Sequence, residues 1–218
     1  MAEWDAYPYF SGMPNLKVTT LTKRFGSRLV IDKLSFDASD SVVAIAGRNG
    51  SGKTTLMRCL AGLIRPSAGS IEWAFDGSLA DREMVRRQVG LAGPWLQLYR
   101  EMSCNENLAF LAKLHRLADA SSRIAETLEW VGLTHQANSR YGSLSSGQQQ
   151  RLKIASAIIH RPAALLLDEP GSNLDEIGTQ MVADIISRWR KPGCLAIIAS
   201  NDSRELDLCD RVINVSSF

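Results

Sequence analysis

A glycine-rich segment with one lysine and two threonines is the part of this chain whose residue types and spacing most clearly imply chemistry. It follows an apolar run at residues 42–46 and precedes a helical pattern. Its residues are Gly47, Arg48, Asn49, Gly50, Ser51, Gly52, Lys53, Thr54 and Thr55. Glycines let successive backbone N–H groups point at phosphate oxygens, and the following helix N-terminus is positive. The segment predicts a phosphate-binding loop, against the alternative of a turn that only connects a strand and a helix.

Two side chains of this loop have separate predicted roles. The Lys53 ammonium can reach the β- and γ-phosphates of a nucleotide, and the Thr54 hydroxyl can hold Mg²⁺. The predicted ligands of this loop are therefore the phosphates of a nucleotide and Mg²⁺.

A later apolar strand ends in two carboxylates. Residues 163–167 are apolar, and Asp168 and Glu169 follow them. An ATPase with a phosphate loop needs such acids beside its metal. We expect Asp168 to assist Mg²⁺ through its water shell and Glu169 to orient or deprotonate the attacking water. A strand ending in a solvated acidic turn is the alternative, and the upstream loop makes it less favoured.

Serine and glycine also mark the start of a later apolar helix. Ser145, Gly147 and Gln148 precede the apolar positions from Leu152 onward. Hydroxyls and free N–H groups at a helix start can bind an anion, although a plain polar helix cap has the same composition. The chain thus has two predicted helix starts that can bind phosphate, and the γ-phosphate of one nucleotide needs fewer within a single domain. One of them is therefore expected to serve a nucleotide held mainly by a second copy.

The elements that must position these residues form an α/β pattern. Short apolar runs of strand length recur along the chain with helical patterns between them, which favours a sheet covered on both faces. The stretch of about 90–160 is mainly helical, with a capping box at Ser103 and Glu106. We predict one domain over residues 16–218 with this helical subdomain inserted, preceded by a loose arm at residues 1–15 that is either weakly docked or an interaction tail.

Composition limits the function classes. The chain has 218 residues, 45% of them hydrophobic, and a formal net charge of +2, so it can build a core and shows no basic footprint for nucleic acid. Its four cysteines have no paired spacing, which predicts reduced thiols in the cytoplasm. No signal peptide and no segment long and apolar enough to span a bilayer is predicted.

In the order of these motifs the chain resembles an ABC-type ATPase, the nucleotide-binding subunit of an ATP-binding-cassette transporter. The resemblance runs from about Leu16 to Val215 and rests on the sequence Leu-Ser-Ser-Gly-Gln at residues 144–148, which lies between the phosphate loop and the acidic strand. It implies a P-loop core with a mixed sheet flanked by helices, an antiparallel β subdomain and an inserted helical subdomain. Residues 47–55 are then similar to Walker A, and residues 165–169 to Walker B.

The resemblance also implies roles that the residues alone do not. Ser145, Gly147 and Gln148 would contact the γ-phosphate bound by a partner ATPase, in a homodimer or a heterodimer with a related subunit. Asp175 would lie in a loop that links the two sites. Phe25 would stack on adenine, although an aromatic residue at this position also suits a core.

Two positions depart from the family pattern. Pro94 stands where the family has a glutamine that contacts Mg²⁺, and Gln97 would replace that glutamine only if the loop shifted. Asn201 stands where the family has a histidine, and an amide can donate a hydrogen bond but cannot carry the charge or the proton. We expect slow hydrolysis, or pairing with a second ATPase subunit that completes one competent site.

The leading interpretation is a subunit that converts closure around MgATP into movement of an integral membrane subunit, held in this way on the cytoplasmic face of the membrane. The cluster Trp95, Leu96, Leu98 and Tyr99 is the expected docking groove, with ordinary core as its alternative. Residues 106–110 resemble the haem-exporter subgroup more weakly. The alternative function is a non-transport ATP switch acting on a soluble or ribosomal partner.

Overall fold

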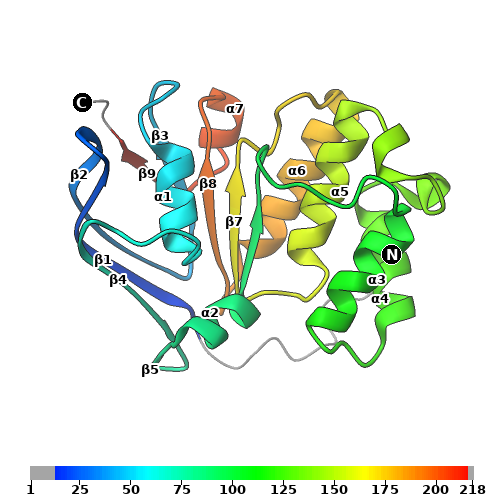
Figure 1. Cartoon of the computed structure of the whole chain (residues 1–218), viewed down its shortest axis with the longest axis horizontal. Helices are drawn as coiled ribbons and strands as arrows, with labels where there is room; N and C mark the ends of the chain where they lie inside the picture. The colour runs from blue at the N-terminus through cyan, green and yellow to red at the C-terminus, as the bar shows by residue number, and fades with distance from the viewer. Residues whose placement is uncertain (1–12, 216–218) are drawn as a thin grey trace.

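The computed structural model describes residues 13–215, which form two sheets and the helices packed on them (Figure 1). Most of the predicted arm, residues 1–12, lies outside the described residues, and the first strand begins at Asn15. Within the described range no helix combines the length and the apolarity that crossing a bilayer requires.

The strands divide into an antiparallel and a parallel sheet. Their bounds are β1 Asn15–Phe25, β2 Arg28–Ser39, β3 Val42–Ala46, β4 Ala68–Phe75, β5 Ser78–Leu79, β6 Val89–Ala92, β7 Ala164–Asp168, β8 Leu195–Ala199 and β9 Arg211–Asn214. The antiparallel sheet has the order β2-β1-β4-β5, and the other, with parallel pairings, has the order β6-β7-β8-β3-β9. Parallel and antiparallel strands with helices on both sides confirm the predicted α/β fold.

The helices flank the parallel sheet. Their bounds are α1 Lys53–Leu60, α2 Arg82–Gln88, α3 Cys104–Leu114, α4 Ala120–Trp130, α5 Ser146–Ile158, α6 Glu176–Trp189 and α7 Ser203–Leu206, with short 3-10 turns at Thr134–Gln136 and Tyr141–Ser143. Figure 1 shows α3 to α6 on one side of the parallel sheet and α1 between that sheet and the antiparallel one. α3, α4 and α5 fall within residues 90–160, where a helical subdomain was predicted; the division into subdomains stays a prediction.

Strand β7 shows why the parallel strands read as continuous apolar runs. All five of its residues are buried, because side chains alternate between two covered faces. Leu165 and Leu167 pack in the cluster built with α3 to α6. Ala164 and Leu166 pack on the other face, with α1 and the antiparallel sheet. The sheet is thereby fixed on both sides, and the loops at the carboxyl ends of its strands are left to carry function.

Local signals set the helix starts. Ser103 and Glu106 form the predicted capping box of α3: the Ser103 hydroxyl accepts from the Glu106 amide at 3.1 Å, and the Glu106 carboxylate accepts from the Ser103 amide at 2.7 Å. α5 begins with a second capping box, between Ser145 and Gln148. A capping residue is worth about 1 kcal/mol, so these ends are well fixed.

Candidate functional site

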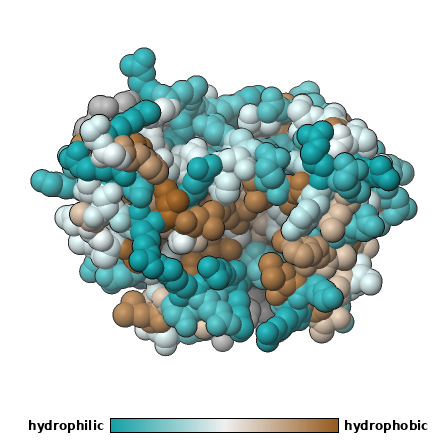
Figure 2. Space-filling view, in the orientation of Figure 1, coloured by the Kyte–Doolittle hydropathy of each residue, from teal (hydrophilic) through white to brown (hydrophobic). Residues whose placement is uncertain are grey.

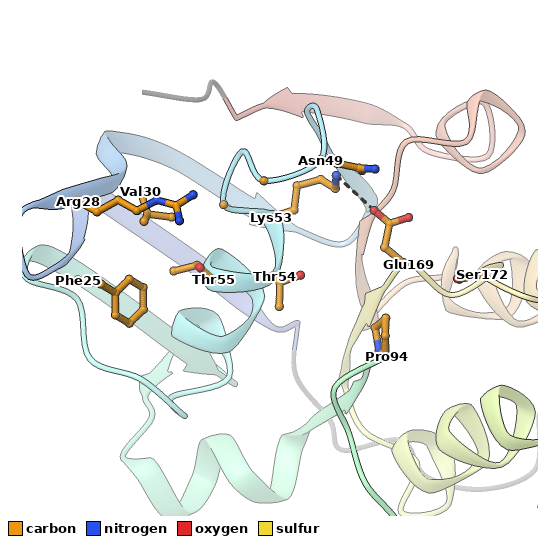
Figure 3. A pocket seen from close by; sticks show the side chains of 12 residues that line it. Phe25, Arg28, Val30, Asn49, Lys53, Thr54, Thr55, Pro94, Glu169 and Ser172 are labelled. Carbon is orange, nitrogen blue, oxygen red and sulfur yellow. Dashed lines mark ion pairs between the residues drawn. The ribbon is translucent and has the colours of Figure 1, made fainter. Parts of the chain in front are cut away.

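A cavity of about 660 Å³ opens where the loops after β3 and β7 face the β1–β2 hairpin (Figure 3). Its lining residues are Phe25, Arg28, Val30, Asn49, Gly50, Gly52, Lys53, Thr54, Thr55, Pro94, Glu169 and Ser172. The cavity therefore joins most of the predicted phosphate loop with one predicted acid and the predicted aromatic residue. Figure 3 shows Phe25 at one end of it and Glu169 at the other.

The phosphate loop lies between β3 and α1, and its glycines are required by the backbone. Gly52 is the N-cap of α1 with φ 104°, and a Cβ there would lie 2.9 Å from the Val30 carbonyl oxygen. Gly50 has φ 82°, and its α-carbon faces open space. Because the N-cap has no side chain, the first-turn amides of α1 keep their donors for a ligand. Such a helix start favours an anion.

Lys53 is the first residue of α1, and its side chain is buried although it carries a charge. Its Nζ donates to the Gly47 carbonyl oxygen at 2.8 Å and lies 3.2 Å from Glu169 Oε1. Glu169 follows β7 in a left-handed conformation, with φ 49°, and its amide donates to the Ala199 carbonyl oxygen. A buried ammonium is thus held at the point where the loop meets the acid. A phosphate entering the loop would compete with Glu169 for this ammonium.

Asp168 is the last residue of β7 and is fully buried. Its Oδ2 accepts a hydrogen bond from the Trp95 indole nitrogen at 3.0 Å, while its Oδ1 has no hydrogen-bond partner among the described residues. An unpaired buried oxygen of this kind is costly without a ligand. The described residues contain no group of three or more His, Cys, Asp or Glu suited to a metal. A Mg²⁺ ion that takes one or two protein oxygens plus phosphate oxygens and waters fits this donor set.

Trp95, in the loop after β6, was expected to lie in a docking groove, and the structure places its side chain differently. The indole of this half-buried residue is turned to Asp168 instead of joining an exposed docking cluster. Leu96, Leu98 and Tyr99 line a separate cavity of about 330 Å³, with Phe110 among its other lining residues. Figure 2 shows that apolar side chains gather across the middle of the face seen in Figure 1, between hydrophilic margins.

Of the two positions that depart from the family pattern, Pro94 lines the 660 Å³ cavity and Asn201 does not. Pro94 lines the cavity, and its carbonyl oxygen accepts from Lys153 Nζ at 2.8 Å. Burial lowers the pKa of the Lys153 ammonium. Asn201 is exposed outside the lining, and its Nδ2 donates to Asn49 Oδ1 at 2.7 Å. Asn201 is therefore joined to the rim of the phosphate loop. Arg48 and Ser51 belong to the loop without lining the cavity, and the Ser51 hydroxyl is buried.

The start of α5 lies outside this cavity. Ser145 is exposed and caps α5, and its hydroxyl accepts from the Gln148 amide at 3.2 Å. Gly147 packs against the segment before α6, where a Cβ would lie 3.0 Å from the Asn173 carbonyl oxygen. The structure of one chain therefore does not bring Ser145, Gly147 or Gln148 together with Lys53.

Asp175 joins α5 to α6 within the chain. Its carboxylate accepts from the Gly178 amide at 2.8 Å and pairs with the Arg151 guanidinium. The Gly178 hydrogen bond is the main cause that lowers the pKa of Asp175. The orientation of the two helices is coupled through this carboxylate.

Several residues that line the cavity or lie close to it were not identified from the sequence. Arg28, Val30 and Ser172 line the cavity because the hairpin and the segment after β7 fold over it. Arg28 reaches the cavity because it pairs with Phe25 across the β1–β2 turn, a register that the structure supplies. Glu205 is buried, which raises the pKa of its carboxyl group, and it lies close to Gly171 in the segment after β7. No local pattern predicts that contact.

The sequence is similar to proteins of one family, the ABC transporter family. The profile of the ABC transporter family matches residues 31–172. The chain is 36% identical over 203 residues to the uncharacterized ABC transporter ATP-binding protein YdbJ of Bacillus subtilis, covering 92% of this chain and 66% of that one. It is 35% identical over 187 residues to the bacitracin transport ATP-binding protein BcrA of Bacillus licheniformis, covering 85% and 61%. The chain thus spans less than two thirds of the length of these relatives.

Two solved structures share the fold. The ATP-binding cassette MJ0796, in a dimeric post-hydrolysis state bound to ADP and Pi, superposes with a TM-score of 0.81 and 25% identity, covering 92% of this chain and 94% of that one. The cbiO1 protein of Clostridium perfringens, part of the cbiONQ ABC transporter complex, superposes with a TM-score of 0.74 and 28% identity, covering 91% and 83%.

Proposed function

Because the chain belongs to the ABC transporter family, we propose that it is an ATP-binding and ATP-hydrolysing subunit of such a transporter. The observation that carries this proposal is the cavity in which Lys53, Thr54 and Glu169 meet beneath a glycine loop. The relatives named as ATP-binding proteins of ABC transporters support it. The weaker resemblance to the haem-exporter subgroup stays a prediction.

The residues present would hold the nucleotide in a defined way. The amides of residues 47–55 and the Lys53 ammonium would bind the phosphates. The Thr54 hydroxyl and Asp168 would hold Mg²⁺, which neutralises charge on the phosphate oxygens when bound. Glu169 would accept the proton of the attacking water once its ion pair with Lys53 opens.

Phe25 is proposed to bind the base, and its exposed ring at the far end of the cavity supports this. Replacing Phe25 with alanine is expected to weaken ATP binding by a factor of about 2–10, because aromatic stacking is worth about 0.5–1.5 kcal/mol beyond area burial. Calorimetry with ATP and with inorganic triphosphate separates the effects. If the Phe25 variant bound ATP and inorganic triphosphate equally more weakly, that result would contradict a base-stacking role.

The second half of the phosphate site is proposed to come from another ATPase chain. Ser145, Gly147 and Gln148 lie outside this chain's cavity, so they are available for a nucleotide bound by a partner. A second copy or a related subunit fits equally. Size-exclusion chromatography of the chain with and without MgATP tests self-association.

Asn201 is proposed to make hydrolysis slow. Its amide is tied to Asn49 and cannot supply the charge of an imidazole. Purified chain is expected to turn over below about ten per second, the usual enzyme median. Asn201→His is expected to raise the rate about tenfold or more, because a positioned acid–base group contributes about 10²–10⁴. A steady-state phosphate-release assay measures both; no gain in the histidine variant would show that Asn201 does not limit the rate.

An integral membrane subunit is the proposed partner, and it would hold the chain at the cytoplasmic face of the membrane. The cavity lined by Leu96, Leu98 and Tyr99 supports a contact there. Co-purification with a multi-span membrane protein supports the transporter. A soluble or ribosomal partner recovered instead would favour a non-transport ATP switch.

A further inference from the structure

The loop after β6 makes a side-chain hydrogen bond to the acidic strand. Trp95 Nε1 donates to Asp168 Oδ2 at 3.0 Å, across 73 residues of sequence. The indole fits because residue 93 is glycine: a Cβ there would lie 2.7 Å from Trp95 Nε1. The Arg58 guanidinium carbon lies 4.5 Å from the centroid of the same ring. The indole is therefore held between α1 and the end of β7.

This contact decides which oxygen of Asp168 is available. The carboxylate is fully buried, and an indole N–H can donate but cannot accept. With Oδ2 occupied, Oδ1 is the oxygen without a partner among residues 13–215. A donor held at one oxygen also restricts rotation of the carboxylate. Groups that orient an acid near a metal commonly affect metal affinity as strongly as 10–100-fold.

The neighbouring residue cannot take this role. Pro94 lines the cavity but has neither a side-chain donor nor an acceptor. Its carbonyl oxygen is occupied by the buried Lys153 ammonium of α5 at 2.8 Å. The backbone at Pro94 is thus anchored, and the polar group that this loop presents to the acidic strand is the indole of Trp95.

We propose that Trp95 is a positioning residue of the magnesium–nucleotide site: it holds Oδ2 of Asp168 and leaves Oδ1 as the oxygen that would serve the metal. The inference rests on the proposed function, since it assigns a role toward the Mg²⁺ of that site. If Trp95 has this role, loss of its indole N–H changes the Mg²⁺ concentration that ATP binding needs more than it changes ATP binding without metal.

The test is a titration of ATP binding against Mg²⁺ with Trp95→Phe, which keeps an aromatic ring under Arg58 and removes the N–H. The Mg²⁺ concentration at half-effect is expected to rise about 10–100-fold. Binding of ATP in EDTA is expected to stay within twofold of the unaltered chain. Trp130→Phe is the matched control, because the Trp130 ring also lies beneath an arginine, with Arg188 at 3.8 Å; it is expected to change neither value.

The outcomes are separable. If the unaltered chain takes up no ATP with or without Mg²⁺, the proposed function and this inference both fail. If it binds MgATP and Trp95→Phe leaves the Mg²⁺ dependence within twofold, or weakens metal-free ATP equally, the inference alone is overturned. Circular dichroism establishes folding. Should the phenylalanine variant not fold, Trp95→His, which keeps a ring N–H, is expected to need less than tenfold more Mg²⁺; a larger increase would overturn the inference.

Discussion

Glu169→Gln is expected to lower the rate of ATP hydrolysis by about 10²–10⁴, the usual contribution of a positioned general base. The carboxylate lies at the cavity wall, 3.2 Å from the Lys53 ammonium, and is about one third exposed. An amide of the same shape cannot accept the proton of the attacking water. Phosphate release at saturating MgATP measures the loss.

The same substitution separates hydrolysis from binding. Glutamine removes the charge that pairs with Lys53, so the ammonium becomes available to phosphate and ATP affinity is expected to be equal or higher. Glu176→Gln is the matched control, because Glu176 is exposed in the first turn of α6. A Glu169 variant that keeps more than a third of the rate would contradict the assignment of the general base.

Lys53→Met is expected to weaken ATP binding about 10- to 100-fold and to reduce hydrolysis by at least as much. Methionine keeps the buried hydrocarbon chain of this residue and removes only the ammonium. A hydrogen bond to a charged group contributes about 1.5–3 kcal/mol, which converts to that range of affinity. Isothermal titration calorimetry with MgATP gives the affinity directly.

Lys113→Met controls for the general loss of a positive charge. Lys113 is exposed in the last turn of α3, far along the chain from the phosphate loop. Its replacement is expected to leave ATP affinity unchanged. Equal affinities for Lys53→Met and the unaltered chain would mean that the phosphates bind elsewhere.

Much of the fold could be predicted because its signals are local. The capping residues of α3 and the buried parallel strands are encoded within a few neighbouring positions. The phosphate loop is also encoded locally. Its glycines adopt positive φ angles, and the glycines themselves are visible within a few residues of sequence. The family profile and the solved structures agree with the α/β fold so predicted.

The contacts that join distant segments could not be predicted in the same way. Trp95 and Asp168 meet only because β6 pairs with β7, and the apolar character of the loop suggested an exposed cluster instead. The Lys153 contact with Pro94 depends on how α5 packs on the same edge. A charged residue in a helical pattern gives no sign that it is buried. The roles of Ser145, Gly147 and Gln148 depend on a second chain and stay predictions.

Calorimetric titration of the unaltered chain with ATP, in magnesium and in EDTA, tests directly whether this chain binds a magnesium–nucleotide complex. We expect saturable uptake of one ATP per chain, tighter when Mg²⁺ is present, because the loop at residues 47–55 would hold the triphosphate and Asp168 would assist its metal. No saturable uptake in either buffer would contradict it.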